Sequence, residues 1–271
     1  MKVHRFLLPA TYIKRLRRAW FQSQYDRQVV RAEEKAKFVA AGLDYDLGIK
    51  ALNDCLSEMG QPSYLQNSSM ASVHWLLFAC LRQRIQPQRI LEIGTYDGQT
   101  TALLAHLFPR SEIVTVELPA SDPILHQTYG RHNREKMAEF ERTLAANTAA
   151  ANVVLLKTNS FFLPAAVQGA FDLIWVDGGH LYPEVAWDLC NAYHLVREGG
   201  YVMCDDVITN PKSYKDSYVS PDSHQVLQYI CHRTSDSLAL FLKREDPRES
   251  ADPRARKFVA LLQKGSGPES K

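Results

Sequence analysis

From Arg89 onward the chain alternates short apolar runs with stretches of helical periodicity. The runs, in chain order, are RILEI, SEIVTVEL, NVVLLKT, FDLIWVD and GYVMCDD. Continuous apolar runs bounded by glycine, proline or aspartate, with helical segments between them, are typical of parallel strands covered on both faces. Two more runs, SLALFLKRE and RKFVALLQK, are joined by a polar loop too short for a helical crossover. We therefore expect an α/β sheet of five parallel strands closed by an antiparallel pair.

The chain before this sheet has a different character. Residues 10–60 have a loose 3.6-residue periodicity that breaks near Gly42 and Gly60, and residues 68–84 carry apolar side chains on one helical face. The tail GSGPESK has the composition of a disordered segment. The predicted division is a helical extension that serves as arm, lid or oligomer contact, a cofactor-binding domain and a tail: 1–85, 86–264 and 265–271.

Charge is uneven along the chain. Through Lys37 there are ten Lys or Arg against three Asp or Glu, although the whole chain has a formal net charge of only +2. Such an arm could touch a membrane surface or a nucleic acid. We favour a helix that packs on the main domain or on a second copy of the chain, and we expect no nucleic acid, because no recognisable binding module surrounds the basic residues.

Membrane spans and disulfides are not expected. No run of about 18 apolar residues is present, and the basic N-terminus has no clean apolar core of a signal peptide. The five cysteines are odd in number and widely spaced. This usage favours reduced thiols in a cytoplasmic protein over a disulfide framework or a zinc site.

The segment RILEIGTYDGQT indicates a cofactor loop at the end of the first predicted strand. A phosphate-binding P-loop needs lysine after its last glycine, but Gln99 follows Gly98. The dinucleotide fingerprint needs three closely spaced glycines, whereas Gly94 and Gly98 stand alone, four residues apart. A carboxylate at Glu92, if aimed at the mouth of the sheet, would repel a pyrophosphate but suit an ammonium group. We expect an adenosine-bearing cofactor that carries such a group.

Three carboxylates are predicted at the ends of the fourth and fifth strands. Asp177 ends one strand, and Asp205 and Asp206 end the other, so all three should meet at the crevice outside the sheet. They would repel one another unless a cation joined them. Oxygen ligands select a hard divalent ion such as Mg²⁺, with positions left for water or substrate oxygens. His180, three residues after Asp177, is suited to removing a proton near neutral pH.

Residues 89–263 resemble the class I S-adenosylmethionine-dependent methyltransferases. The loop E-I-G-T-Y-D-G matches the first motif of that family, Glu117 stands where the family binds the ribose hydroxyls, and residues 159–161 stand where it contacts adenine. The resemblance implies a Rossmann-like seven-stranded sheet of order 3-2-1-4-5-7-6 with an antiparallel last strand, and S-adenosylmethionine as cofactor. The cofactor-binding residues that it implies are Glu92, Gly94, Tyr96, Gly98, Thr100, Glu117, Leu118, Asn159, Ser160, Phe161 and Asp177.

Within that class, the D-x-x-H at Asp177 to His180 and the pair Asp205-Asp206 resemble the metal-dependent O-methyltransferases of the macrolide-sugar (macrocin-type) and cephalosporin-hydroxylase-like group. The resemblance implies catalytic roles for His180 and Asp177, and Mg²⁺ or another hard divalent ion bound by Asp177, Asp205 and Asp206. The expected activity is methylation of a small molecule with adjacent hydroxyls, a sugar or another substrate of natural product biosynthesis.

Two alternatives stay open at this point. One is metal-independent methylation of nitrogen or carbon, with the aspartates organising the surroundings of the cofactor. The other is a non-catalytic cofactor-binding scaffold recruited by the basic arm. The long loop after the fifth strand contains Tyr214 and Tyr218, which could stack on a ring of the acceptor.

Overall fold

The protein is described by a computed structural model covering residues 10–64, 72–129, 131–210, 220–234 and 236–265. Tyr214, Tyr218 and all but the first residue of the predicted tail lie outside these residues. Within the described ranges, no helix is both long enough and apolar enough to cross a lipid bilayer.

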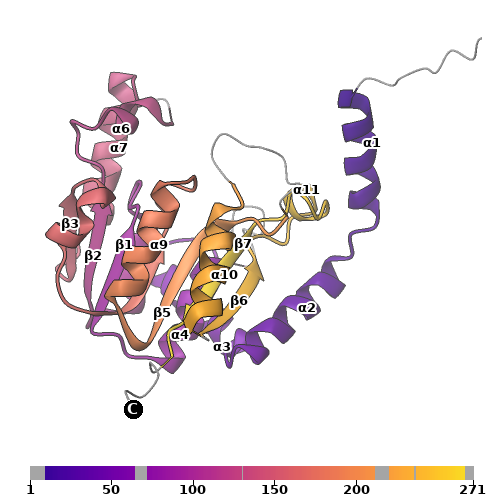
Figure 1. Cartoon of the computed structure of the whole chain (residues 1–271), viewed down its shortest axis with the longest axis horizontal. Coiled ribbons are helices and arrows are strands. Elements are labelled where there is room, and N and C mark those ends of the chain that lie inside the picture. Colours follow the sequence, from indigo (N-terminus) through magenta and orange to yellow (C-terminus); the bar gives the residue numbers. More distant parts are fainter. Residues whose placement is uncertain (1–9, 65–71, 130, 211–219, 235, 266–271) are drawn as a thin grey trace, which may run out of the picture.

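One seven-stranded sheet lies at the centre of the molecule, with the strand order β3-β2-β1-β4-β5-β7-β6 (Figure 1). The strands are β1 (Arg89–Ile93), β2 (Glu112–Glu117), β3 (Val153–Lys157), β4 (Phe171–Val176), β5 (Val196–Val207), β6 (Ser237–Leu242) and β7 (Phe258–Gln263). The first five strands run parallel, and β7 runs antiparallel to β5 and β6. The predicted sheet is confirmed, including its order and its antiparallel last strand.

Helices cover both faces of this sheet. They are α1 (Ala10–Ser23), α2 (Arg27–Ala40), α3 (Tyr45–Glu58), α4 (Val73–Arg84), α5 (Gln99–Leu107), α6 (Pro123–Gln127), α7 (Arg134–Asn147), the 3₁₀ helix η1 (Ser160–Phe162), α8 (Leu163–Ala166), α9 (Glu184–Leu195), α10 (Asp222–Thr234) and α11 (Pro247–Ser250). Side-chain oxygens of Asp26, Asp44 and Asn133 accept from backbone N–H groups at the starts of α2, α3 and α7.

The core has two apolar layers because alternate strand residues face opposite sides. Trp175 packs with α3, α4 and α5, whereas its neighbour Ile174 packs with α9 and α10. The N-terminal helices α3 and α4 therefore form one of the layers that bury the sheet. Helix α4 is described from Val73, and its predicted start at residue 68 lies outside the described residues.

The first two helices extend away from the sheet (Figure 1). Helix α2 anchors one end through Phe38, whose ring lies 4.6 Å from that of Phe241 in β6. Helix α1 contacts the loop between β6 and β7, where Arg17 pairs with Asp252 at 2.6 Å. The basic arm thus packs on the main domain at this loop.

Candidate active site

The loop between β1 and α5 contains two residues, Gly94 and Gly98, whose positive φ angles favour glycine. Gly94 has φ +96°, and a Cβ there would lie 2.3 Å from the carbonyl oxygen of Asp177. The close approach is thus between the ends of β1 and β4, and the space that Gly94 leaves open is filled by protein backbone. Gly98, with φ +80°, precedes the first residue of α5. Tyr96 also has a positive φ, of 51°.

Glu92 lies beneath this loop, and its side chain does not face the mouth of the sheet as expected. It is 0% exposed, and one carboxylate oxygen accepts from Thr101 at 2.5 Å and from Thr115 at 2.6 Å. Burial raises the pKa of Glu92 to about 7, against the two hydrogen bonds. Because it is enclosed, Glu92 has no exposed surface with which to contact an ammonium group. Its hydrogen bonds instead connect β1 to α5 through Thr101 and to β2 through Thr115.

Glu117, at the end of β2, orders the same loop from the side. Its carboxylate accepts from the backbone N–H of Tyr96 at 2.6 Å and from that of Leu118 at 3.1 Å. Burial raises the pKa of Glu117, and these two bonds oppose the shift. Each carboxylate oxygen has further lone pairs that can accept from a bound molecule.

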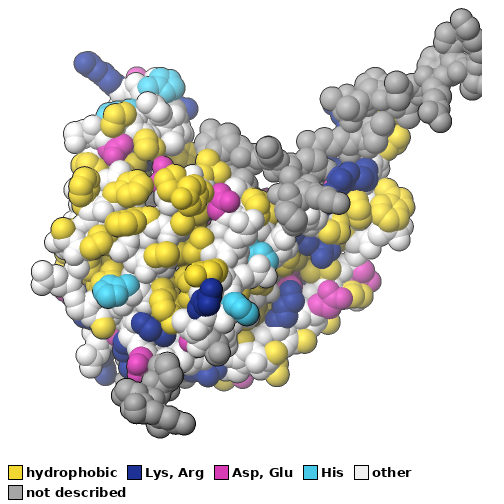
Figure 2. Space-filling model, in the orientation of Figure 1, with side chains coloured by type: hydrophobic (Ala, Val, Ile, Leu, Met, Phe, Trp, Pro, Cys, Tyr) yellow, Lys and Arg dark blue, Asp and Glu magenta, His cyan; other side chains and the backbone are white. Residues whose placement is uncertain are grey.

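The predicted adenine contacts lie together after β3. Asn159 accepts from the N–H of Phe161 at 3.0 Å, and the indole N–H of Trp187 in α9 donates to the carbonyl of Ser160 at 3.0 Å. The rings of Phe161 and Trp187 are 5.8 Å apart. The large exposed apolar side chains of η1 and α9 are Phe161, Phe162 and Trp187, and Figure 2 shows apolar side chains gathered on the face where α9 lies. Trp187 is an aromatic contact that the sequence did not single out.

A cavity of about 430 Å³ opens beside the glycine loop and the ends of β4 and β5. Of the predicted site residues, Gly94, Tyr96, Thr100, Asp177 and Asp205 line it. The N-terminal helical layer and the segments beside it supply the opposite wall, which was not predicted: Leu56, Gln61, Pro62, Tyr64, Ser72, His74 and Trp75. The cavity therefore lies between the helical extension and the cofactor loop.

His74 in this wall is a neutral, buried histidine. Its ring stacks on Trp175 at 4.7 Å, and its Nδ1 lies 2.7 Å from the hydroxyl of Ser72. Burial lowers the pKa of His74 to about 4. Its stacking indicates a structural role, although its side chain also borders the cavity.

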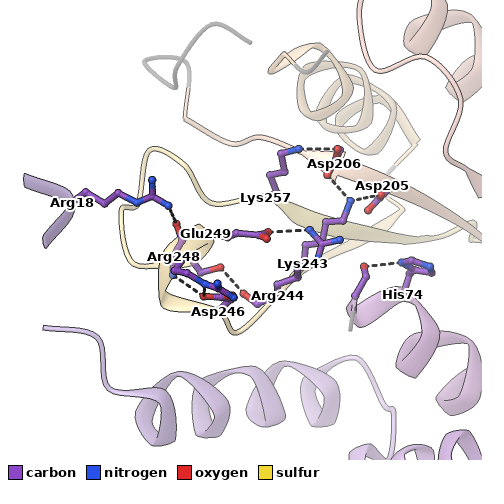
Figure 3. Close-up of polar contacts among 12 residues, drawn as sticks. Arg18, His74, Asp205, Asp206, Lys243, Arg244, Asp246, Arg248, Glu249 and Lys257 are labelled. Carbon is purple, nitrogen blue, oxygen red and sulfur yellow. Dashed lines mark hydrogen bonds and ion pairs between the residues drawn. The ribbon is translucent and has the colours of Figure 1, made fainter. Parts of the chain in front are cut away.

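Two of the three predicted metal ligands, Asp205 and Asp206, meet lysines instead (Figure 3). The ammonium of Lys243 lies 2.5 Å from Asp205 Oδ2 and 2.6 Å from Asp206 Oδ1, and that of Lys257 lies 2.9 Å from Asp206 Oδ2. In the described part of the chain, no group of three or more His, Cys, Asp or Glu is arranged to hold a metal ion. A divalent ion between Asp205 and Asp206 would have to displace Lys243, so these residues do not fit Mg²⁺.

The two adjacent aspartates reach the same lysine because β5 is irregular at this point. The pairing of β5 with β7 shifts between Cys204 and Val207, and Asp206 has φ +51°. In a regular strand, consecutive side chains point to opposite faces. The bulge turns Asp206 so that both carboxylates contact Lys243.

The charges of this cluster compensate one another. Burial is the largest single influence and would raise the pKa of Asp205 and of Asp206, but the neighbouring positive charges and hydrogen bonds, those of Lys243 foremost, together lower both. Burial, and then the charge of Asp205, raise the pKa of Asp177 well above its ordinary value. Two carboxylates thus face two ammonium groups, while Asp177 favours its neutral form.

His180 borders this cluster. Its Nε2 lies 3.6 Å from Asp177 Oδ1 and 4.0 Å from Asp206 Oδ2, and its side chain is 19% exposed. Burial lowers the pKa of His180, although the charges of Asp206 and Asp205 oppose the shift. Near neutral pH the imidazole is therefore neutral and able to accept a proton.

Comparison with known proteins gives a family match for the centre of the sheet. Residues 91–207, from β1 to the end of β5, match the family Methyltransf_24, described as a methyltransferase domain. Among curated protein sequences, none matches the chain.

Solved structures resemble this chain over most of its length. One is a Staphylococcus aureus protein assigned as a caffeoyl-CoA O-methyltransferase, with 15% identity, a TM-score of 0.51, and coverage of 78% of this chain and 96% of that one. Another is the O-methyltransferase TomG from Streptomyces achromogenes, with 19% identity, a TM-score of 0.48, and coverage of 86% and 96%. At these identities the likeness concerns the fold.

Proposed function

We propose that the chain is a class I S-adenosylmethionine-dependent methyltransferase and that it methylates a hydroxyl group of a small molecule bound in the cavity beside the glycine loop. The observation that carries this proposal is a neutral, part-buried His180 next to the carboxyl ends of β4 and β5. Its Nε2 lies 3.6 Å from Asp177, which lines the cavity, although His180 itself is not among the lining residues. A base in that place can remove the proton of a hydroxyl as the oxygen attacks a methyl group.

For the cofactor, we propose that the glycine loop holds the methionyl part, Glu117 accepts from the ribose hydroxyls, and Phe161 and Trp187 flank the adenine. The geometry supports this division because the free lone pairs of Glu117 and the exposed ring of Phe161 lie at the ends of adjacent strands. Bound S-adenosylmethionine would supply the sulfonium methyl group.

The chain's own residues would manage the proton and the charge. His180 would take the hydroxyl proton, and the resulting imidazolium would lie 4.0 Å from Asp206, whose charge stabilises it. The other neighbouring carboxyl, that of Asp177, lies 3.6 Å away and favours its neutral form. Lys243 lines the cavity and can donate a hydrogen bond to the acceptor oxygen. Both effects favour transfer to oxygen.

The structure supports a hydroxyl as the reacting group but says less about the rest of the acceptor molecule. Adjacent hydroxyls were expected because a divalent ion would offer two positions to substrate oxygens, and Lys243 removes that argument. We propose an acceptor with one reactive hydroxyl on a ring, since Tyr64, Trp75 and Tyr96 are among the residues lining the cavity. Sugars and aromatic natural products both fit this description.

Metal-independent methylation of nitrogen remains the second candidate, because a lysine occupies the place expected for the metal. Nitrogen acceptors that are neutral at pH 7 need no base before they attack. The two candidates therefore differ in their dependence on His180.

The test is turnover of the purified chain with S-adenosylmethionine and a panel of phenols, sugars and amines, read by mass spectrometry of the product. With a hydroxyl acceptor, His180→Ala should slow turnover by about 10² to 10⁴, the usual contribution of a general base. The wild-type rate should rise with pH through the lowered pKa of His180 and level off by neutral pH, and the variant should lose that rise.

His132→Ala is the matched control, because His132 lies outside this cluster, and it should behave as the wild type. Full turnover of a hydroxyl acceptor by His180→Ala would contradict the role of His180. Methylation of amines alone would favour the second candidate.

A further inference from the structure

The carboxylates at the end of β5 are arranged as a cation site that the chain fills itself. Asp205 and Asp206 are buried, and each contributes one oxygen to the same ammonium group at 2.5 and 2.6 Å. Lys243 is itself 8% exposed. Buried carboxylates need a compensating cation. Here that cation is a side chain of the same protein, since Lys243 is the first residue after β6.

The lysine is held in place by the backbone on both sides. Lys243 N donates to the carbonyl of Lys257 at 2.9 Å, and the carbonyl of Lys243 accepts from the N–H of Val73 at 2.9 Å. The N–H of the preceding Leu242 donates to the buried carboxylate of Glu34 at 2.8 Å. The position of the ammonium is therefore fixed by the sheet and by two N-terminal helices.

A second lysine completes the compensation. Lys257 contacts the other oxygen of Asp206 at 2.9 Å, so Asp206 has an ammonium at each oxygen. A magnesium ion needs about six oxygen ligands in octahedral geometry at 2.0–2.1 Å. Carboxylate oxygens already paired with lysines do not offer that geometry.

We infer that the ammonium group of Lys243 replaces a divalent cation in this protein, so that the aspartates at the end of β5 are organised without any metal ion. The inference deepens the proposed function, since it concerns the same site, but it is tested through metal binding alone. It predicts methyl transfer that is insensitive to chelators.

The experiment titrates Mn²⁺ into the full chain and follows free Mn²⁺ by its electron paramagnetic resonance signal. The wild type should show no stoichiometric Mn²⁺ binding. Lys243→Met should gain one site per chain with an affinity at least tenfold above that of the wild type, because the carboxylates then lack their cation. Lys35→Met is the matched control: Lys35 pairs with an exposed aspartate, Asp46, and its loss should leave Mn²⁺ binding as in the wild type.

Two results would overturn the inference. One is a wild-type chain that binds one Mn²⁺ and loses it in Asp205→Asn. The other is a folded Lys243→Met that gains no site. If Lys243→Met does not fold, the wild-type and Asp205→Asn titrations decide the question by themselves. Absence of turnover with every acceptor would contradict the proposed function and leave the Mn²⁺ result unaffected.

Discussion

The sheet stabilises buried acids at the carboxyl ends of its strands in two different ways. We call the group around Glu92 and Glu117 the neutral half, and the group around Asp205 and Asp206 the charged half. At β1 and β2, Glu92 and Glu117 are held by threonine hydroxyls and backbone N–H groups. At β5, Asp205 and Asp206 are held by ammonium groups. Neutral donors leave a buried carboxyl with a raised pKa, whereas lysines keep it ionised. In the proposed site, the first half therefore holds its acids with neutral donors beside the cofactor, and the second holds a fixed set of charges beside the reacting atoms.

The largest effect should come from breaking the charged half. Lys243→Met leaves two buried carboxylates short of a cation, and removal of one partner from a buried ion pair costs about 3–5 kcal/mol. Urea unfolding should show a loss of that size in the free energy of unfolding. Thr115→Val, which removes the hydrogen bonds of the Thr115 hydroxyl with Glu92 and Thr95, should cost about 1–3 kcal/mol. An equal or smaller loss for Lys243→Met would contradict the contrast between the two halves.

In the neutral half, Glu92 should make the stability of the folded chain depend on pH. Glu92 has a folded-state pKa of about 7 against an ordinary value of 4.5, so the folded chain holds more protons than the unfolded chain between these values. Its contribution to stability therefore falls as pH rises through that window, by about 3 kcal/mol at most. Glu92→Gln should remove this dependence, so the variant should gain on the wild type from pH 5 to pH 8 in thermal unfolding. A parallel pH profile for the two proteins would show that Glu92 does not titrate in this window.

A smaller effect is expected where the neutral half meets the cofactor. Glu117→Ala should weaken S-adenosylmethionine binding by about 1.5–3 kcal/mol, the range for hydrogen bonds to a charged group. Calorimetry measures this directly, with Glu112→Ala as control because Glu112 lies at the opposite end of β2. Unchanged affinity in Glu117→Ala would remove Glu117 from the ribose.

The smallest effect should follow removal of the arm. Deleting residues 1–20 should leave S-adenosylmethionine affinity unchanged in calorimetry, because the glycine loop and Glu117 make no contact with α1 among the described residues. The arm packs on the β6–β7 loop at Asp252, so a shift in oligomeric state or acceptor affinity would be informative. A loss of folding would place the arm in the core.

The sequence predicts the strands that carry the neutral half because each apolar run is local, but it does not predict that Glu92 is enclosed. The apolar runs identified all seven strands, and the partners of Glu117 are Tyr96 and Leu118, which belong to the same motif-bearing segment. Gly94 was predicted as part of a cofactor loop, and the need for glycine that the structure shows comes from the backbone of Asp177, just after β4.

The charged half could not be predicted in the same way. Asp205 and Lys243 are 38 residues apart, and Asp206 and Lys257 are 51 apart. From the sequence alone, three acids at strand ends favour a metal site, because the lysines that neutralise Asp205 and Asp206 are recognised only in the folded sheet. A lysine just after the end of the sixth strand and another just before the seventh were the available signal. Only the pairing of β6 with β7 gives that signal its meaning, because it brings both lysines to the end of β5.

The backbone hydrogen bond between Lys243 and Lys257 also determines which insertions and deletions the protein can tolerate. The two residues form the base of the loop that contains α11, so the segment between them can change length while both ammonium groups stay in register. A single residue added within β6 or β7 would instead slip the pairing and turn one lysine to the opposite face. Relatives that keep this charge arrangement should therefore vary in loop length between the lysines and keep constant spacing within each strand.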